Sequence, residues 1–476
     1  MSSTPNILWI VSDHQIHAGK PPGLDLFPLQ SKLSRLGVEF SRAFSVLPIC
    51  SPARASMLTG LYPHAHGLTE NDGRFGGRAG LDDSDWMIHH ALQQVGYRCG
   101  WFGKWHVDNH RSAIDYGFEG FSLPGYGYPY ASDAYRDYLR DQQLPDPLAR
   151  VEIAGESAMP IGSEVSLLEA TSWFDYESGV ARLEGPAQLH EAFFVAEQAR
   201  RWIESLDQGP FFARIDTWGP HPPYLLAPPF HGMLDSCEIE LPASFYSQLE
   251  SRPRHHRDYR DYWRSTLGLD AEGWRQMYQR ALEHAILVES ALSVLLQQVD
   301  LEQTLVIFNS DHGDAVGSNG GVANKGGLMV EATMRIPLLM AGAGISAAQT
   351  RDQLVSQLDL APTILDFCGL EVDSRLHGSS LAGLIADDDS RWRQGLMAQH
   401  YGLHQPIRQR AWYQDEWKLV IQPDGYRELY NLQQDADELD NLAAEPRYAE
   451  ILLSLQRQLA QAMSEVGDDY MLPFGE

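Results

Sequence analysis

Two continuous apolar runs, each followed at once by an aspartate and a histidine, constrain the fold of this chain most strongly. Residues 7–12 lead directly into Asp13 and His14, and residues 305–310 lead into Asp311 and His312. A run without alternation predicts a strand buried on both faces, as in a parallel sheet covered by helices. Further strands are predicted at 211–215 and 336–341, with helices at 86–95, 189–206 and 274–299. This alternation predicts an α/β sandwich with a large, mostly parallel central sheet.

The residue composition and the pattern of predicted elements change in three places. Residues 116–185 are rich in Tyr, Gly, Pro and Asp, and residues 228–273 contain a dense basic and aromatic stretch. Both are predicted to be irregular insertions, which are functional segments or solvated loops. From residue 395 onward, short strands at 409–413, 417–421 and 428–432 and a helix at 448–466 predict a smaller α+β subdomain. We therefore expect a catalytic domain over 1–394 and a C-terminal subdomain over 395–476.

Composition excludes several classes of protein. The chain has 64 acidic and 36 basic side chains, a net charge of −28, which argues against a nucleic-acid partner. Its four cysteines have neither disulfide-framework nor zinc-site spacing. No stretch approaches the about 18 apolar residues of a membrane span, and no signal peptide is evident. We expect a cytoplasmic protein without a membrane partner, unless a leader was removed, and both a monomer and a homo-oligomer stay open.

The segment from Cys50 to Gly60 carries the most specific chemistry. Cys50 stands at the start of a predicted helix, with Pro52 in its first turn and Arg54 four residues on. A helix N-terminus lowers the pKa of a thiol and favours anions, so the pattern indicates a reactive cysteine or an anion site. On spacing alone, an ordinary buried cysteine is the alternative.

This segment resembles the CxPxR…TG signature of the type I sulfatases of the alkaline phosphatase superfamily, and further motifs extend the resemblance over nearly the whole chain. In order, they are residues 6–13, Gly103-Lys104-Trp105-His106, Pro220-His221-Pro222-Pro223-Tyr224, Ser310-Asp311-His312-Gly313, Lys325 before Arg335-Ile336-Pro337, residues 359–363, and residues 428–432 with Asn441-Leu442. The resemblance implies an alkaline-phosphatase-like sandwich and hydrolysis of a sulfate ester.

The resemblance also implies two cofactors. In that family the cysteine, here Cys50, is oxidised by a formylglycine-generating enzyme to Cα-formylglycine, whose hydrated aldehyde is the nucleophile. The implied ligands of one divalent cation are Asp13, Asp311, His312 and the residue derived from Cys50, with His14 as a further candidate. His14 stands where the common pattern has a second Asp, and His312 where it has an Asn. This arrangement resembles the branch of choline sulfatases and phosphonate monoester hydrolases. Calcium is the first expectation, and the added imidazole makes manganese the next.

The remaining roles are likewise carried over from the family. Arg54 would orient the nucleophile, and Lys104 and Lys325 would bind the sulfate oxygens. His221 would act as general acid toward the ester oxygen, and His106 as the base that restores the aldehyde. Asn71 is a further sulfate-binding candidate, although Asn-Asp-Gly is also a common turn sequence.

The basic and aromatic stretch suggests a substrate. Guanidinium groups grip sulfate or carboxylate, and aromatic rings stack on sugars, so we expect a sulfated saccharide with further anionic groups. The candidate residues are Arg252, Arg254, Arg257 and Arg264; a solvated charge run is the alternative. Two other functions stay open: a phosphonate monoester or phosphodiester hydrolase, and a non-catalytic binder of sulfated glycans, against which the intact signature argues.

Overall fold

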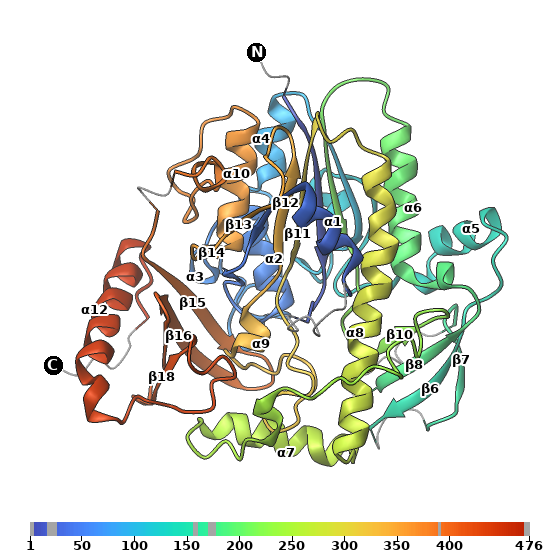
Figure 1. Ribbon diagram of the computed structural model, residues 1–476. Helices are drawn as coiled ribbons and strands as arrows, with labels where there is room; N and C mark the ends of the chain where they lie inside the picture. The colour runs from blue at the N-terminus through green and yellow to red at the C-terminus, as the bar shows by residue number, and fades with distance from the viewer. Residues whose placement is uncertain (1–3, 17–25, 156–159, 170–177, 389–391, 471–476) are drawn as a thin grey trace.

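The computed structural model describes residues 4–16, 26–155, 160–169, 178–388 and 392–470, and its centre is an eight-stranded sheet (Figure 1). The strand order is β13-β2-β12-β11-β1-β9-β4-β5. The bounds are β1 Asn6–Ser12, β2 Gly37–Phe40, β4 Arg98–Lys104, β5 Glu119–Leu123, β9 Phe211–Asp216, β11 Thr304–Ser310, β12 Leu338–Gly342 and β13 Gln349–Arg351. The predicted large, mostly parallel sheet is confirmed.

The two apolar runs are adjacent strands of this sheet. β1 pairs with β11 in parallel, with Ser12 opposite Ser310, so the residues that follow them meet at one edge. On its other side β1 pairs in parallel with β9, and β9 with β4. Only β12 runs against its neighbours, β11 and β2, within this sheet. The carboxyl ends of four parallel strands therefore lie together at the lower edge in Figure 1.

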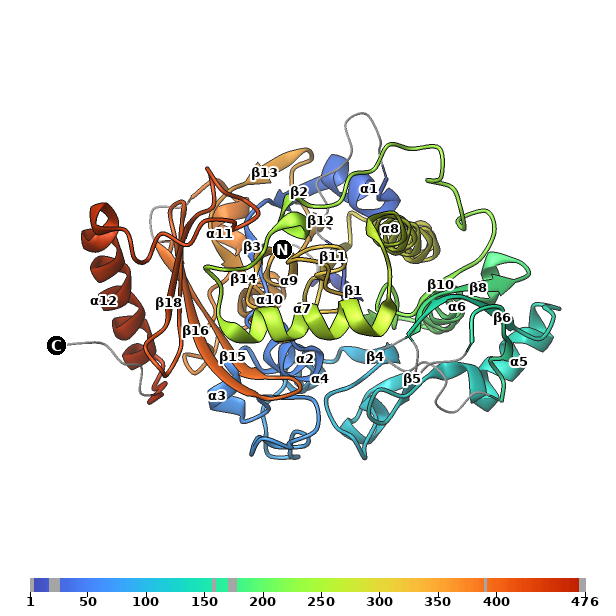
Figure 2. The same ribbon diagram turned by 90° about the horizontal axis from the view of Figure 1, so that it is seen from below.

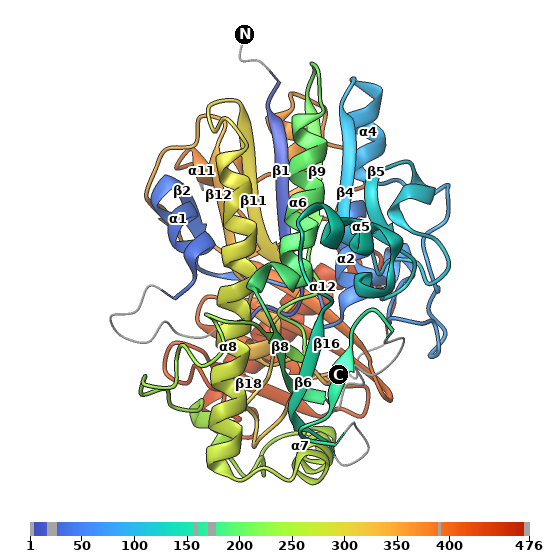
Figure 3. The same ribbon diagram turned by 90° about the vertical axis from the view of Figure 1, so that its right-hand side faces the viewer.

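Helices cover both faces of the sheet (Figure 1), and Figure 3 looks onto one of these faces. Leu8 and Ile10 pack on the side of α1 (Pro28–Leu36), α6 (Glu191–Glu204) and α8 (Ala271–Ser293). Ile7 and Trp9 pack on the opposite side, against α2 (Cys50–Thr59), α4 (Ile88–Gln94) and α10 (Leu360–Phe367). Alternate residues of β1 thus face two separate apolar layers, which explains why the strand has no polar face.

Side-chain caps set the starts of two long helices. α8 begins after Asp270, whose carboxylate accepts a hydrogen bond from the Gly273 amide, and α6 begins after His190, which accepts from Ala192. α2 ends at Gly60, whose φ of 67° is the left-handed conformation that terminates a helix. The predicted helices at 86–95, 189–206 and 274–299 correspond to α4, α6 and α8, with shifted ends.

Both predicted insertions contain regular structure, so their description as irregular is wrong. Within 116–185 lie α5 (Asp133–Asp141), β6 (Leu148–Ala154), β7 (Glu164–Ser166) and β8 (Ser178–Glu184), and β8 pairs with β10 (Tyr224–Leu226) in a second sheet. Within 228–273, α7 spans Arg254–Leu267. Its buried residues are His256, Trp263 and Leu267, too few apolar positions to show a helical period in the sequence.

The C-terminal part forms an antiparallel sheet with one long helix. Strands β15 (Gly395–Gly402), β16 (Pro406–Gln414), β17 (Trp417–Ile421) and β18 (Arg427–Asn431) pair in sequence order, and α12 (Ala449–Glu465) packs on them. Met397 and Leu419 of this sheet share an apolar cluster with Ile49, the residue before Cys50. The sheet therefore supports the start of α2, while the boundary at 394/395 stays a prediction.

The remaining elements are short. They are β3 (Ala43–Phe44), β14 (Val355–Ser356), α3 (Pro63–His66), α9 (Glu331–Met334) and α11 (Ala382–Ile385). Among the described residues, no helix combines the length and the apolar character needed to cross a membrane.

Candidate active site

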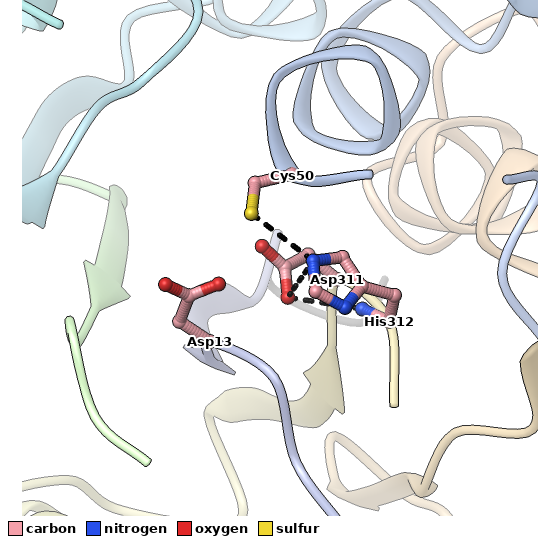
Figure 4. Close-up of side chains that lie close together, drawn as sticks. All are labelled: Asp13, Cys50, Asp311 and His312. Atoms are coloured by element: carbon pink, nitrogen blue, oxygen red, sulfur yellow. Dashed lines mark hydrogen bonds and ion pairs between the residues drawn. The ribbon is translucent and has the colours of Figure 1, made fainter. Parts of the chain in front are cut away.

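Four predicted metal ligands meet at the carboxyl edge of the central sheet (Figure 4). Asp13 follows β1, Asp311 and His312 follow β11, and Cys50 begins α2. One ligand atom from each lies within 4.8 Å of the others, and all four residues are buried. Three sequence motifs that span residues 13 to 312 thus form one cluster of two carboxylates, one imidazole and one thiol.

The cluster is held by its own backbone. The Asp311 carboxylate accepts hydrogen bonds from the amides of His14, at 3.0 Å, and His312, at 2.9 Å. His312 Nδ1 lies 2.9 Å from the Gly313 carbonyl oxygen, so Nδ1 donates and Nε2 faces the Cys50 Sγ at 3.1 Å. This hydrogen bond leaves Nε2 as the ligand atom of His312.

The electrostatics of the two carboxylates fit a bound cation. Burial raises the pKa of Asp13 well above its ordinary value, and the neighbouring Asp311 carboxylate raises it further. Burial acts in the same direction on Asp311, but the His312 ring and the Arg54 guanidinium hold its pKa well below the ordinary value. One Asp13 oxygen, Oδ1, is buried and has no hydrogen-bond partner among the residues that the structure describes. A divalent ion among these four donors would neutralise that oxygen.

Arg54 is a central cation of the site. Its guanidinium contacts Asp216 at 2.5 Å and Asp311 at 3.0 Å, and it lies 3.7 Å from Asp13. All four side chains are fully buried, and the three carboxylates raise the pKa of Arg54 despite its burial.

Asp216 was not among the residues predicted from the sequence, although, like Asp13, it is an aspartate at the carboxyl end of a buried strand. Asp216 is the last residue of β9, the neighbour of β1, and it accepts hydrogen bonds from Arg54 and Arg214. A polar residue at the carboxyl end of a predicted buried strand was the available signal.

The two predicted sulfate-binding lysines flank the cluster. Lys104, at the end of β4, pairs with Asp13 and lies 4.3 Å from the centre of the Tyr126 ring. Lys325 Nζ lies 3.2 Å from His221 Nε2 and 3.3 Å from Oδ1, the side-chain oxygen of Asn324. Both lysines are at most 1% exposed, so their charges face the site and not the solvent.

The two histidines predicted as acid and base are also buried here. His221 Nδ1 lies 2.6 Å from the Pro222 carbonyl oxygen, so Nδ1 donates and Nε2 faces Lys325. Burial and the nearby cations, Lys325 for His221 and Lys104 for His106, lower the pKa of both rings well below the ordinary value. His106 Nδ1 has no hydrogen-bond partner among the described residues.

His14 and Asn71 lie near the cluster, but the contacts that the structure shows for them are not the predicted ones. His14 is outside the four-donor group: its Nε2 is 3.9 Å from Asp314, and its ring packs near those of His221 and His312. Its role as a metal ligand stays a prediction. Asn71 Oδ1 accepts a hydrogen bond from the Ser51 amide at 3.1 Å, so it fixes the start of α2. A contact of Asn71 with sulfate stays a prediction.

The predicted anion-binding arginines are mostly committed to the protein itself. Arg252 is buried and pairs with Glu428 at 3.2 Å, and it also contacts Glu438. Arg257 donates to the carbonyls of Leu249 and Arg252, and Arg264 donates to the Gly320 carbonyl. Arg254 is exposed and pairs with Asp258, one turn along α7. Arg252, Arg257 and Arg264 therefore tie α7 to its surroundings. For the buried Arg252 this corrects the expectation that it binds substrate, and substrate contacts of Arg257 and the exposed Arg264 stay predictions.

The family follows from comparison with known proteins. A sulfatase family profile matches residues 5–370, which is most of the chain. The chain belongs to the sulfatase family. A second profile, the C-terminal region of N-sulphoglucosamine sulphohydrolase, matches residues 323–465 of this sulfatase. The resemblance inferred from the motifs is confirmed, and so is the assignment of the chain as a sulfuric ester hydrolase.

Individual relatives are distant but match over nearly full length. An ulvan-active sulfatase of Formosa agariphila is 24% identical, over 98% of this chain and 82% of its own. A solved structure bound to D-glucosamine-2-N,6-O-disulfate has a TM-score of 0.74 at 20% identity, covering 98% of this chain and 99% of the other. A phosphonate monoester hydrolase of Silicibacter pomeroyi has a TM-score of 0.76 at 20% identity, covering 97% and 95%. These structures share the fold of this sulfatase.

Proposed function

We propose that this sulfatase hydrolyses the sulfate ester of a saccharide to an alcohol and inorganic sulfate, with formylglycine derived from Cys50 as the nucleophile. One observation carries the proposal: Asp13, Cys50, Asp311 and His312 converge within 4.8 Å. A hydrated aldehyde at position 50 would place a hydroxyl at the centre of this cluster. The conversion requires a formylglycine-generating enzyme in the host.

The proposed metal is one divalent cation held by Asp13, Asp311, His312 and the residue derived from Cys50. The Asp13 oxygen Oδ1, which lacks a hydrogen bond within the described part of the chain, and the two buried carboxylates support it. When bound, the ion would lower the pKa of the attacking hydroxyl and stabilise charge on the sulfuryl oxygens. The carboxylates suit calcium, our first expectation, and His312 favours manganese as the next. Elemental analysis of the purified protein decides between them.

The protein side chains divide the remaining tasks. Arg54 holds Asp311 in place through its 3.0 Å contact and adds positive charge beside Cys50. Lys104 and Lys325 approach from two sides and would bind the sulfate oxygens as charge develops on them. Because His221 Nδ1 donates to the Pro222 carbonyl, Nε2 is the atom that would face the leaving alcohol. It would carry a proton from the Lys325 ammonium, 3.2 Å away, to that alcohol. His106 Nδ1 would accept the proton whose removal releases sulfate.

The choice of a saccharide as substrate is supported by the relatives. One relative carries the name of an ulvan-active sulfatase, and one solved neighbour holds a sulfated glucosamine. Because these proteins are only 24% and 20% identical to this chain, they suggest the substrate class and leave the particular sugar to experiment.

The test begins with protein produced together with a formylglycine-generating enzyme. Mass spectrometry of the peptide that contains Cys50 measures conversion, and release of inorganic sulfate from sulfated sugars measures turnover. We expect turnover in proportion to the converted fraction, and its loss on metal removal by a chelator. Fully converted, metal-loaded protein that releases sulfate from no member of the panel would reject the proposal.

A phosphonate monoester or phosphodiester hydrolase is the second candidate. The structural similarity to a phosphonate monoester hydrolase favours it, as does the presence of His312 where many sulfatases have an Asn. Matched nitrophenyl esters of sulfate, phosphate diester and phosphonate separate the two readings. A higher kcat/KM for the sulfate supports the first, and a higher value for either phosphorus ester supports the second.

A further inference from the structure

A cavity of about 370 Å³ lies between α7 and the turn that joins β15 to β16. Figure 2 shows α7 crossing below the carboxyl ends of the central strands, with the β15–β16 hairpin beside it. Tyr259 and Tyr262 from α7 and Leu403 and His404 from the hairpin line the cavity. The Tyr259 and His404 rings are near-parallel, 24° apart, with centroids at 6.0 Å. The cavity is thus aromatic on two sides.

The cavity adjoins the proposed sulfate-binding residues. Gly326, which also lines it, directly follows Lys325. The Tyr259 ring packs so closely on Gly326 that a methyl group there would overlap the ring. Gly326 has a φ of 54°, so the backbone of the Lys325 segment turns against this tyrosine. The cavity therefore begins one residue along the chain from a lysine that is proposed to bind sulfate.

The lining contains no cation to receive a second anionic group. Among the described residues that line the cavity there is no Lys or Arg, and Asp258 carries the one formal charge. Burial lowers the pKa of His255 to about 4 and also lowers that of His404, so both imidazoles are neutral near pH 7. Of the four arginines singled out in the sequence, Arg252 is buried, and the half-buried Arg257 and the exposed Arg264 donate to backbone carbonyls. The fourth, Arg254, pairs with Asp258.

We propose that this cavity is the subsite for the sugar ring that bears the sulfate ester, and that it selects an otherwise uncharged ring by stacking on Tyr259, Tyr262 and His404. The inference rests on the proposed function and names the substrate class of that site. Aromatic walls with few polar groups suit the apolar faces of a sugar ring. A second sulfate or a carboxylate on the same ring would meet Asp258 and no Lys or Arg among the described residues that line the cavity.

Binding to unconverted protein tests the subsite without turnover. Protein made without the modifying enzyme and confirmed by mass to retain Cys50 is titrated calorimetrically, in the presence of calcium, with three probes. These are N-acetylglucosamine 6-O-sulfate, glucosamine 2-N,6-O-disulfate and inorganic sulfate. We expect the first to bind about tenfold more tightly than the second.

Tyr262 supplies the variant, because it is 44% exposed and its removal spares the core. Y262A should weaken binding of N-acetylglucosamine 6-O-sulfate about fivefold to tenfold, the size of an aromatic stacking contact, and leave binding of inorganic sulfate unchanged. Y246A is the matched control, since Tyr246 is 66% exposed and lies outside the cavity lining. It should change none of the three dissociation constants.

Several results would overturn the subsite. They are an unchanged affinity of Y262A for N-acetylglucosamine 6-O-sulfate, a tighter complex of the wild type with the disulfate, or binding of N-acetylglucosamine 6-O-sulfate no tighter than that of inorganic sulfate. Turnover by converted enzyme is measured separately. Tyr262-dependent binding without turnover would reject the proposed chemistry and keep the subsite, and turnover without dependence on Tyr262 would do the reverse.

Discussion

Arg54 shows how much of the site depends on one side chain. Its guanidinium joins Asp216, Asp311 and the Lys104 carbonyl oxygen, three groups from three strand ends. A lysine would keep the charge but offers a single ammonium in place of the planar fork, so it cannot satisfy all three. R54K should therefore fold and lose about 10²-fold in kcat/KM, measured as sulfate release by converted enzyme.

The control for R54K is a surface arginine. Arg98 pairs with Glu119, and both side chains are nearly half exposed. R98K should leave kcat/KM and the melting temperature unchanged. If R54K keeps full activity while its conversion and melting temperature match the wild type, Arg54 has no special part in the site.

At the scale of single residues, sequence reasoning succeeded where chain position fixes side-chain position. Asp13 and Asp311 were found because each directly follows a buried strand, and parallel strands bring such residues to one edge. Arg252 was misjudged because its direction depends on Glu428 and Glu438, acids 176 and 186 residues away. Composition counts a charge but does not show which way its side chain points.

At the scale of elements, the start of α6 holds the loop that carries His221. Glu191, the first residue of α6, accepts a hydrogen bond from the Gly219 amide at 2.8 Å, two residues before His221. Burial raises the pKa of Glu191 to about 8. The folded protein therefore keeps this proton up to about pH 8, whereas the unfolded chain releases it near the ordinary pKa of about 4.3.

The sign of the resulting pH effect is set by proton binding. Between about pH 4.3 and 8 the unfolded state binds fewer protons at this group, so the free energy of unfolding falls as pH rises. E191Q keeps an acceptor for the Gly219 amide and cannot ionise. Its stability relative to the wild type should therefore grow from pH 5.5 to 8 and then level off, measured by urea unfolding.

Glu197 on the same helix gives the matched control. Its hydrogen bond with Arg200 lowers the pKa of Glu197. Its contribution to the free energy of unfolding is therefore already constant at pH values above the ordinary pKa of a glutamate. E197Q should show no gain with rising pH over the same range. An E191Q curve parallel to that of the wild type would mean that Glu191 is ionised in the folded protein.

α7 is anchored to the C-terminal sheet by buried charge. Arg252, next to the start of α7, is 4% exposed and bridges Glu428 of β18 and the Glu438 segment. Removing one partner leaves buried carboxylates uncompensated, which typically costs 3–5 kcal/mol. R252A should lower the free energy of unfolding by about 3 kcal/mol or more, and R254A should leave it nearly unchanged. Equal free energies of unfolding for R252A and R254A would show that the ion pairs of Arg252 do not stabilise the fold.

At the scale of the whole molecule, the sandwich was predictable and its attachments were not. Apolar runs at 7–12 and 305–310 are long enough to specify buried strands by themselves. The second sheet and α7 depend on contacts between segments far apart in the chain, such as β8 with β10. The sequence of α7 is polar and aromatic, so a period of 3.6 does not stand out in it. The cavity proposed as the sugar subsite lies between two such segments, α7 and the β15–β16 hairpin.

The net charge of −28 predicts how salt affects the reaction. Lys104, Lys325 and Arg54 are at most 1% exposed, and two of them are paired with carboxylates, so little of their field reaches the solvent. An approaching sulfate ester therefore experiences mainly the negative surface, whose field extends about 30 Å at 0.01 M salt and about 8 Å at 0.15 M. Raising sodium chloride between these concentrations should increase kcat/KM about twofold to fivefold and leave kcat unchanged. Glucosamine 2-N,6-O-disulfate, with its extra charge, should show a steeper increase than N-acetylglucosamine 6-O-sulfate. A kcat/KM that falls with salt would show that the buried cations attract substrate from outside the site.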